Sequence, residues 1–470
     1  MDFLRKLKEN SIKYKNTICY KVYDQSITYG ELWEKANYYG SFLKREGFSS
    51  VVIFGNKSIN ILISIIACLI AKRSYVPVDF CTPLNRIKQI IEDCNSSLII
   101  TDEILELDNV NVVRLDELIK YSNKEALDIE NDIAYIIFTS GSTGRAKGVP
   151  ISYENLDNFI SWISRHDYLN TANNLNVLNQ ASFAFDLSVA DLYYSLNNGH
   201  TLVSLTREEQ ESYSNIYNKI GKENINFIVS TPSFIRMCLL DKNFNSYNFP
   251  DLKCIYFCGE ILDKQLVKKI FDFFPNMYII NAYGPTEATS AISSIRITKN
   301  MIDNEEALPI GDMNTLATEV FIENNEIVLK GKSFSNGYLN FVGGFYKDSG
   351  INCFRTGDLG FIHDNKLYFS GRKDNQIKYM GYRIELNDIE ENIKQIDGVI
   401  DCAVIAKLDS FNKVKMIKAF VVLNDITLVD VKNKLKTVLP NYMIPKVMIA
   451  LDALPINNNG KVDRKVLNEI

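Results

Sequence analysis

A chain of 470 residues is longer than one hydrophobic core usually supports, so the sequence predicts at least two domains. Hydrophobic residues make up 46% of the chain, and the net charge of -5 arises from acidic and basic residues that are mixed along it. This composition predicts no nucleic-acid-binding surface and favours small molecules or a modest protein partner.

Further classes of protein are excluded by local features. The start, MDFLRKLKEN, is charged throughout, unlike a signal peptide, and the most apolar stretch, Ile59–Ala71, is too short to span a bilayer. The nine cysteines form no CxxC pair, which predicts free thiols in a reducing compartment. The three histidines are isolated, so neither a zinc site nor a histidine-based triad is supported. We expect a cytoplasmic monomer without membrane insertion.

From about Val51 to Gly284, short apolar runs alternate with longer amphipathic stretches. The runs are SVVIFG, SLIITD, AYIIFTS, HTLVSL, NFIVST, LKCIYFCGE and MYIINAYG. This alternation predicts mostly parallel sheets covered by helices, with ligands bound at the carboxyl ends of the strands. The polar or glycine tips that follow the runs lie where such a site is expected.

The tail of the chain has a different pattern. After Gly371, the segments NQIKYMGYRIEL, DCAVIAKL and MIKAFVVL predict strands, mixed with helices near residues 387–395 and 428–438. The fold class is therefore α/β, with a large N-terminal α/β domain over residues 1–371 and a small, mobile C-terminal α+β domain over 372–470. A hinge is expected near residues 372–374.

A glycine-rich loop, FTSGSTGRAKGV, occupies residues 138–149 directly after an apolar run. Glycines let a ligand approach the main chain, and hydroxyls, N–H groups and lysine suit a phosphate. The spacing does not fit a Walker A loop, because Lys147 is preceded by Ala146 and followed by Gly148. Taken alone, the loop is either a phosphate site or only a turn.

Six motifs in order resemble those of the adenylate-forming superfamily. They are the loop at 138–149, FDLS at 185–188, NAYGPTE at 281–287, FRTGDLG at 354–360, GRKDNQIKYMGYRIE at 371–385 and NNGKVDR at 458–464. Within that superfamily, NQASFAFDLSVADLY, STPSF and FCGE are most similar to D-alanine:D-alanyl carrier protein ligases and to stand-alone adenylation domains of peptide synthetases.

The resemblance implies ATP as the nucleotide and assigns it a set of residues. They are Thr139, Ser140, Gly141, Ser142, Thr143, Gly144, Lys147, Asn281, Ala282, Tyr283, Gly284, Pro285, Thr286, Asp358, Gly371, Arg372, Lys373, Asp374 and Lys461. The glycine-rich loop would hold the β- and γ-phosphates, Asn281 and Tyr283 the adenine, and Asp358 the ribose. The alternative for each is an ordinary turn residue or a solvated charge.

The resemblance also implies catalytic roles for Thr286, Glu287 and Lys461. Thr286 would bind phosphate, and Glu287 would be the Mg²⁺ ligand, a hard oxygen for a hard cation. Lys461 would bridge the substrate carboxylate and the α-phosphate as charge develops. Asp374 matches the hinge position of the family. Without the family, Glu287 would be interpreted as a surface charge and Lys461 as an exposed lysine in a turn-rich terminus.

Asp186 distinguishes amino-acid activation from acyl-CoA ligation, because only an amino acid brings an ammonium that needs a carboxylate. The alternative is a helix N-cap. By resemblance the substrate pocket is lined by Asp186, Leu187, Ala190, Val229, Tyr256, Cys258, Ala282, Ser290 and Ala291, with Lys461 at the carboxylate. Ala190, Ala282 and Ser290 depart from the D-alanine ligase pattern and predict a wider, more polar pocket, whereas Cys258 matches it and can influence handedness.

The implied reaction has two half-reactions. An amino acid and ATP give an aminoacyl-adenylate and pyrophosphate, and a phosphopantetheine thiol then takes the aminoacyl group. Since no carrier sequence follows Arg464, we expect the thiol to arrive on a separate carrier protein. D-alanine is the favoured substrate, another small neutral amino acid is the alternative, and an acyl-CoA ligase is a weaker one.

Overall fold

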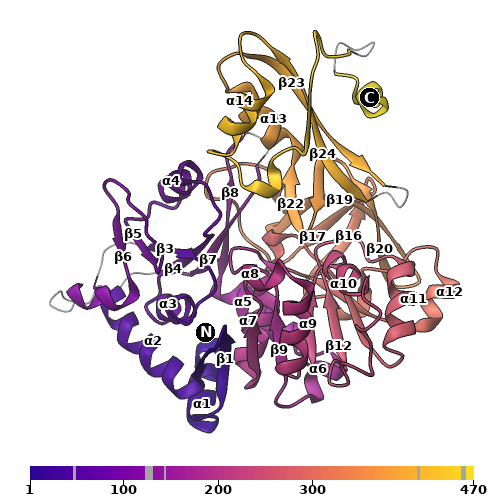
Figure 1. Ribbon diagram of the computed structural model, residues 1–470. Helices are drawn as coiled ribbons and strands as arrows, with labels where there is room; N and C mark the ends of the chain where they lie inside the picture. Colours follow the sequence, from indigo (N-terminus) through magenta and orange to yellow (C-terminus); the bar gives the residue numbers. More distant parts are fainter. Residues whose placement is uncertain (46–48, 122–130, 142–143, 410–412, 457–461) are drawn as a thin grey trace. The chain divides into compact units, whose positions relative to one another are not determined.

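The computed structural model describes residues 1–45, 49–121, 131–141, 144–409, 413–456 and 462–470 (Figure 1). The chain divides into two compact units. The larger unit comprises Met1–Phe80, Cys94–Ile137 and Val149–Gly371, and the smaller comprises Cys81–Asp93, Phe138–Gly148 and Arg372–Ile470. The predicted division into residues 1–371 and 372–470 places residues 81–93 and 138–148 in the large domain, whereas they belong to the smaller unit here. The division into an adenylation core and a lid domain stays a prediction.

The first sheet of the larger unit has eight strands. In spatial order they are β14 (Ser293–Ile297), β13 (Tyr278–Tyr283), β12 (Cys254–Phe257), β11 (Phe227–Ser230), β9 (Asn176–Asn179), β10 (Thr201–Ser204), β1 (Ile18–Val22) and β2 (Gln25–Thr28). The six strands from β13 to β1 run parallel, and only β14 and β2 pair antiparallel at the edges. The carboxyl ends of β9, β11, β12 and β13 therefore meet at one edge of the sheet.

The second sheet is also mainly parallel. Its order is β6 (Asn111–Val113), β5 (Leu98–Thr101), β3 (Ser50–Gly55), β4 (Ser74–Asp79), β7 (Ile133–Thr139) and β8 (Lys147–Ser152). The pairs from β6 to β7 are parallel, as the alternating apolar runs predict. The predicted α/β class with mostly parallel sheets is confirmed.

A third sheet, which was not predicted, completes the larger unit. It contains β15 (Gly311–Asp312), β20 (Lys366–Arg372), β19 (Ile351–His363), β17 (Glu326–Lys330) and β16 (Glu319–Glu323), and β18 (Phe345–Asp348) pairs with β19. The β15–β20, β16–β17, β17–β19 and β18–β19 pairs are antiparallel. Strand β19 carries Asp358.

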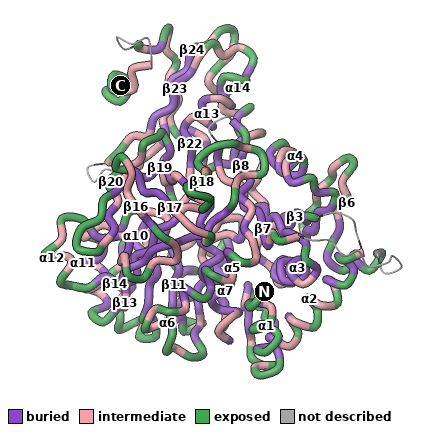
Figure 2. Tube along the Cα trace, turned by 180° about the vertical axis from the view of Figure 1, so that it is seen from behind, coloured by how far each residue is buried: buried purple, intermediate pink, exposed green. Residues whose placement is uncertain are grey.

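Two faces of the eight-stranded sheet are covered by different helices. The inward residues of α9 (Tyr213–Lys222), α10 (Pro232–Cys238) and α11 (Lys264–Phe273) share a core with Ile228, Ile255 and Ile279. Alternate strand positions, such as Val229 and Tyr256, share the other core with α7 (Leu187–Asn198) and α3 (Ile59–Ile70). The strands are largely buried, and many of the loops that join them are exposed (Figure 2).

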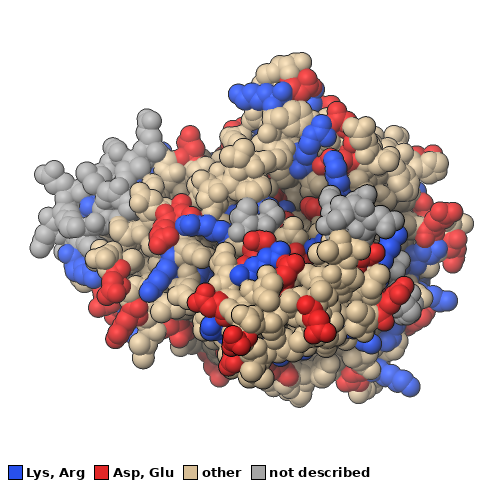
Figure 3. All heavy atoms as spheres, turned by 90° about the horizontal axis from the view of Figure 1, so that it is seen from above, with Lys and Arg blue, Asp and Glu red and all other residues tan. Residues whose placement is uncertain are grey.

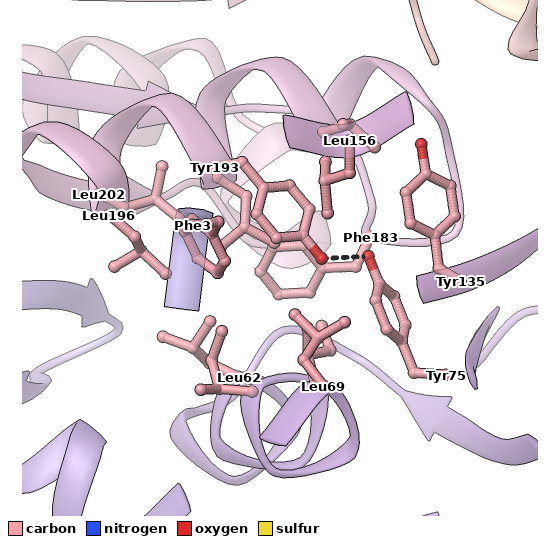
Figure 4. Packing of buried hydrophobic residues seen from close by; sticks show 14 of the residues in the cluster. Phe3, Leu62, Leu69, Tyr75, Tyr135, Leu156, Phe183, Tyr193, Leu196 and Leu202 are labelled. Atoms are coloured by element: carbon pink, nitrogen blue, oxygen red, sulfur yellow. Dashed lines mark hydrogen bonds between the residues drawn. The ribbon is translucent and has the colours of Figure 1, made fainter. Parts of the chain in front are cut away.

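Helices α3 and α7 meet in this second core (Figure 4). Leu62 and Leu69 of α3 approach Tyr193 of α7, whose hydroxyl lies 2.7 Å from that of Tyr75. The expected buried helix over residues 59–71 is confirmed. The other helices of the larger unit are α1 (Asp2–Lys13), α2 (Tyr29–Leu43), α5 (Tyr153–Ile163), α6 (Asp167–Thr171), α8 (Arg207–Gln210) and α12 (Lys299–Asn304).

The smaller unit is an α+β structure. A hairpin of β21 (Gln376–Tyr379) and β22 (Tyr382–Glu385) precedes a sheet of β23 (Val399–Leu408), β24 (Val414–Leu423) and β25 (Val447–Ala450). Its helices are α4 (Leu84–Asp93), α13 (Leu386–Lys394), α14 (Leu428–Leu435) and α15 (Arg464–Glu469). Helices α13 and α14 share a core with β23 and β24, so the helices and strands predicted after Gly371 are confirmed.

Three further features of the structure concern the cysteines, the surface charges and the helix lengths. All nine cysteines are free thiols. On the face drawn in Figure 3, basic and acidic side chains lie next to each other. Among the described residues, no helix combines the length and the apolar character that crossing a bilayer requires.

A buried histidine predicts a loss of stability in mild acid. His200 is 2% exposed, its Nδ1 accepts the backbone N–H of Leu175, and its Nε2 lies 3.3 Å from the Tyr194 hydroxyl. Burial lowers the pKa of His200 from 6.5 to about 4. Below the unfolded pKa, the unfolded chain binds a proton that folded His200 does not. The contribution of His200 to the free energy of unfolding is therefore fully present above about pH 6.5, and roughly 2 to 3 kcal/mol of it is lost as the pH falls towards about 4.

Urea unfolding at about pH 7.5 and about pH 5 would measure this loss. His200→Gln should reduce the difference between the two pH values, because glutamine does not titrate. His363→Gln is the matched control, since that ring is exposed. An unchanged pH dependence in the His200 variant would show that the ring is not the titrating group.

Candidate active site

The candidate site of the larger unit lies at the carboxyl ends of four adjacent parallel strands. Strands β9, β11, β12 and β13 are neighbours in the sheet, and each is followed by a polar or glycine-containing segment. These segments carry Asp186, Thr231, Gly259 and Thr286. The topology thus brings together motifs that are about a hundred residues apart in the sequence.

Asp186 and Thr286 are in direct contact. The Thr286 hydroxyl donates to Asp186 Oδ2 at 2.6 Å. Asp186 occupies the N-cap position of α7, but within the described part of the chain its side chain makes no capping hydrogen bond. The alternative that Asp186 is present only to cap the helix is therefore not supported by its contacts. The carboxylate is held by a residue of the NAYGPTE motif instead.

The residues predicted to line the amino-acid pocket are buried together. Those assigned to one core cluster are Leu187, Ala190, Val229, Tyr256, Cys258, Ala282 and Ala291. The Cys258 thiol donates to the backbone carbonyl of Ser290 at 3.5 Å, which connects the end of β12 to the segment after β13. Apart from Asp186, the predicted lining carries no charge. Their roles toward a substrate stay predictions.

Two adjacent residues of this segment have unusual backbones. Thr289 and Ser290 have φ values of 56° and 78°, in a region that residues other than glycine rarely adopt. Their hydroxyls are buried, and no described residue provides them with a hydrogen-bond partner. An unpaired buried hydroxyl costs about 1 to 3 kcal/mol. Backbone conformations of this rare kind also cost free energy, and they concentrate at functional positions. No local sequence pattern predicted these backbone conformations.

Glu287 is fully buried and is anchored by a tyrosine that sequence analysis missed. Tyr338 donates its hydroxyl to Glu287 Oε1 at 2.5 Å, and the Glu287 carbonyl accepts from the backbone N–H of Ser335. A fixed carboxylate of this kind fits Mg²⁺, which takes one or two carboxylate oxygens while phosphates and waters complete its shell. Tyr338 lies 51 residues from Glu287, and no local motif connects them.

Two residues predicted to bind the nucleoside are hydrogen-bonded to each other. Tyr283 donates to Asp358 Oδ2 at 2.6 Å, and both side chains are buried. Asn281, predicted to read adenine, donates one amide N–H to the carbonyl of Pro309 at 2.7 Å. Gly284 is required sterically, because a Cβ atom there would lie 2.5 Å from the Cα of Ala291.

The described part of the glycine-rich loop belongs to the smaller unit. The Ser140 hydroxyl donates to the carbonyl of Arg383 and accepts from the N–H of Glu385. The Gly141 N–H donates to Asp388 Oδ2 at 3.3 Å, and Lys147 Nζ lies 3.5 Å from Glu385 Oε1. Two of the loop donors predicted to hold phosphate oxygens, the Gly141 N–H and Lys147 Nζ, thus contact the carboxylates of Asp388 and Glu385. Carboxylate oxygens and phosphate oxygens are both good acceptors for such donors.

These contacts are supported by α4 and α13. Arg86 of α4 lies 3.2 Å from Asp388 Oδ2, and Asn392 of α13 donates to the carbonyl of Gly144. Burial raises the pKa of Asp388, although Arg86 opposes this. Only glycine fits at position 141, where a Cβ would lie 2.1 Å from the Arg145 carbonyl oxygen. The glycine-rich loop was recognisable in the sequence, whereas no motif pointed to Arg86 or Asp388.

The predicted hinge contains a two-pronged ion pair. Arg372 Nε and an Arg372 terminal nitrogen donate to the two carboxylate oxygens of Asp374 at 2.7 and 2.6 Å. Burial works against ionisation, but the hydrogen bonds from Arg372 lower the pKa of Asp374 overall. Of the other predicted site residues, Ser142, Thr143 and Lys461 lie outside the described residues.

The larger unit is an α/β structure with polar residues at the carboxyl ends of its parallel strands, which is where ligands bind in folds of this class. The chain belongs to the AMP-binding enzyme family. The model for "AMP-binding enzyme" matches residues 7–339, and that for "AMP-binding enzyme C-terminal domain" matches residues 388–461.

Two curated relatives are similar over nearly their whole length. The D-alanine--D-alanyl carrier protein ligase of Listeria monocytogenes serotype 4b (strain CLIP80459) is 39% identical, and the alignment covers 96% of this chain and 95% of that protein. The protein of that name from Bacillus velezensis is 34% identical, with 95% of each chain covered.

A solved structure gives the same fold. The Vibrio cholerae adenylation domain AlmE, in complex with glycyl-adenosine-5'-phosphate, matches with a TM-score of 0.85 and 23% identity. The match covers 99% of this chain and 97% of AlmE. At this identity the likeness shows the fold alone.

Proposed function

We propose that this enzyme is an AMP-forming ligase that activates D-alanine with ATP and transfers it to the phosphopantetheine thiol of a separate carrier protein. The observation that carries the proposal is the Asp186 carboxylate, held 2.6 Å from the Thr286 hydroxyl beside an otherwise uncharged set of predicted pocket residues. A carboxylate in that position suits the ammonium of an amino acid. Full-length similarity to the D-alanine--D-alanyl carrier protein ligases supports the choice of substrate and partner.

In this proposal the larger unit binds the amino acid and the nucleoside. Asp186 pairs with the ammonium, and Asp358, oriented by Tyr283, accepts hydrogen bonds from the ribose hydroxyls. Glu287, oriented by Tyr338, would hold Mg²⁺, which supplies positive charge to the phosphate oxygens when bound. Thr286 contacts Asp186 and directly precedes Glu287, so it connects the amino-acid site to the phosphate site.

Charge at the α-phosphate is the main obstacle to adenylation. A carboxylate attacks phosphorus while pyrophosphate leaves, so positioning and electrostatic stabilisation carry most of the catalysis. We assign the donors Ser140, Gly141 and Lys147 to the β- and γ-phosphates, and Lys461 to the α-phosphate and the substrate carboxylate. ATP would have to replace the carboxylates of Glu385 and Asp388 that now contact the loop.

The pocket favours a small, neutral amino acid. A charged substrate side chain would be buried without a partner, because Asp186 is used by the ammonium. Ala190 and Ser290 depart from the D-alanine ligase pattern, so another small neutral amino acid is the second candidate. The difference of one methylene group is worth only about 1 to 3 kcal/mol, so the two candidates should differ by roughly 10- to 200-fold in kcat/KM.

Amino-acid-dependent exchange of labelled pyrophosphate into ATP tests the proposal. D-alanine should give a higher kcat/KM than L-alanine, glycine, serine or proline, and it should load a holo carrier protein but not its apo form. If the kcat/KM of an L-amino acid exceeds that of D-alanine by more than about tenfold, or about 1.4 kcal/mol, the D-alanine assignment is wrong. A peptide-synthetase role for the same chemistry would then replace it.

A further inference from the structure

A buried lysine lies outside every motif that the proposed chemistry uses. Lys57 follows β3 and is 6% exposed. Its Nζ donates to three backbone carbonyls, those of Asn179 at 2.8 Å, Gln180 at 3.0 Å and Leu205 at 3.0 Å. Three acceptors around one nitrogen match the three protons of an ammonium. Lys57 thus connects the second sheet to the ends of β9 and β10 in the first.

Asn179, the last residue of β9, extends this network into the loop that ends at Asp186. Its amide nitrogen donates to the carbonyl of Ala181 at 3.1 Å and lies 3.1 Å from both carboxylate oxygens of Asp191. Its amide oxygen accepts from the Ser204 hydroxyl at 2.7 Å. Three successive carbonyls, from residue 179 to residue 181, are therefore held by Lys57 and Asn179.

Asp191 connects the same network to α7. It is fully buried and lies five residues after Asp186, within the helix that Asp186 precedes. The loop from Gln180 to Asp186 is thus held at its start by Lys57 and Asn179, and at its end by the Asp186 contact with Thr286. A rigid support of this kind is what a precisely placed binding group requires.

The network is costly to bury. Burial lowers the pKa of Lys57 to about 7, and nearby Lys219 lowers it further, although the carboxylates of Asp191, Asp79 and Glu209 favour the charged lysine. Burial also raises the pKa of Asp191 to about 8. Apolar residues of similar volume are often equally or more stabilising than buried charges. The arrangement is therefore better explained by positioning than by stability.

We propose that Lys57 and Asp191 are positioning residues for the amino-acid site, which fix the Gln180–Asp186 loop and the start of α7 so that Asp186 meets the substrate ammonium. Neither residue touches the substrate. The inference rests on the proposed function, because it gives Asp186 the role of binding the ammonium. It predicts an effect on the amino acid that is separate from any effect on ATP.

Replacing Lys57 with methionine (Lys57→Met) tests the proposed positioning role, because methionine keeps a long side chain and loses all three N–H donors. In pyrophosphate exchange we expect the KM for D-alanine to rise about tenfold or more, while the KM for ATP stays within about threefold of wild type. Asp191→Asn, which keeps the shape, should raise the same KM in the same direction. Lys57→Arg should retain more of the affinity for D-alanine than Lys57→Met, because arginine keeps a positive charge and N–H donors for the three carbonyls.

Lys264→Met is the matched control. Lys264 also donates to a backbone carbonyl, that of Glu305 at 2.7 Å, but it lies on α11, away from the loop. This variant should change the melting temperature at most, and neither KM.

If Lys57→Met and Asp191→Asn raise both KM values equally, or leave the KM for D-alanine within about twofold of wild type, the positioning role is wrong. Absence of any D-alanine-dependent exchange by the wild-type enzyme would overturn the proposed function instead. Should Lys57→Met fail to fold, Lys57→Arg and Asp191→Asn still decide the question.

Discussion

Replacing Asp186 with asparagine should lower kcat/KM for D-alanine by about a hundredfold or more. A substrate ammonium that enters the site without a carboxylate is buried unpaired, and removing one partner of a buried ion pair costs about 3 kcal/mol or more. Asparagine retains an oxygen that can accept from the Thr286 hydroxyl, which now lies 2.6 Å from the carboxylate. The variant therefore removes the charge and keeps the local hydrogen bond.

D-lactate provides a substrate-side control, because it replaces the ammonium of D-alanine with a hydroxyl. The wild-type enzyme should strongly prefer D-alanine over D-lactate, and Asp186→Asn should remove most of that preference. Asp167→Asn is the protein-side control, since Asp167 is an exposed aspartate at the start of α6. If Asp186→Asn keeps the wild-type preference, Asp186 serves the helix start and not the substrate.

Local patterns were sufficient to predict most of the parallel part of the fold. Runs such as SVVIFG and MYIINAYG form β3 and β13, because continuous apolar segments with polar tips suit strands that are buried on both faces. The order of the strands was not predictable in this way. Strand β1 pairs with β10, about 180 residues later, and only the packed structure reveals this pair.

The antiparallel sheet from β15 to β20 was missed for a different reason. Its longest strand, Ile351–His363, contains Arg355, Gly357, Asp358 and Gly360, so it has no continuous apolar run. Burial along it alternates instead, because only one face packs inward. The strand was visible in the sequence only as the FRTGDLG motif, which drew attention to Asp358 and not to the sheet that holds it.

Candidate site residues could be proposed where a motif is contiguous, and the residues that contact them could not. FDLS and NAYGPTE suggested Asp186, Thr286 and Glu287, whose roles stay predictions, but nothing near them in the sequence pointed to Tyr338 or Lys57. Both are ordinary residues in ordinary local sequence, and their role arises from contacts across 51 and 122 positions of the chain. The new hypothesis rests on Lys57, which holds the start of the loop that leads to Asp186.

Lys461→Ala should abolish adenylate formation and leave transfer from a preformed adenylate nearly intact. We assign Lys461 to the α-phosphate and the substrate carboxylate during the first half-reaction only. Removing one contact to charge that develops in the transition state costs about 3 kcal/mol, roughly a hundredfold in rate. The second half-reaction breaks the acyl–phosphate bond after pyrophosphate has left, so it does not need that contact.

Two assays on one preparation separate the half-reactions. Pyrophosphate exchange reports adenylation, and loading of a holo carrier protein from synthetic D-alanyl-adenylate reports transfer. Lys465→Ala is the matched control, because Lys465 is an exposed lysine four positions later, on α15, and should affect neither assay. Equal losses in both assays for Lys461→Ala would mean that the lysine supports the fold or both reactions, and its assignment to the adenylation step alone would have to be abandoned.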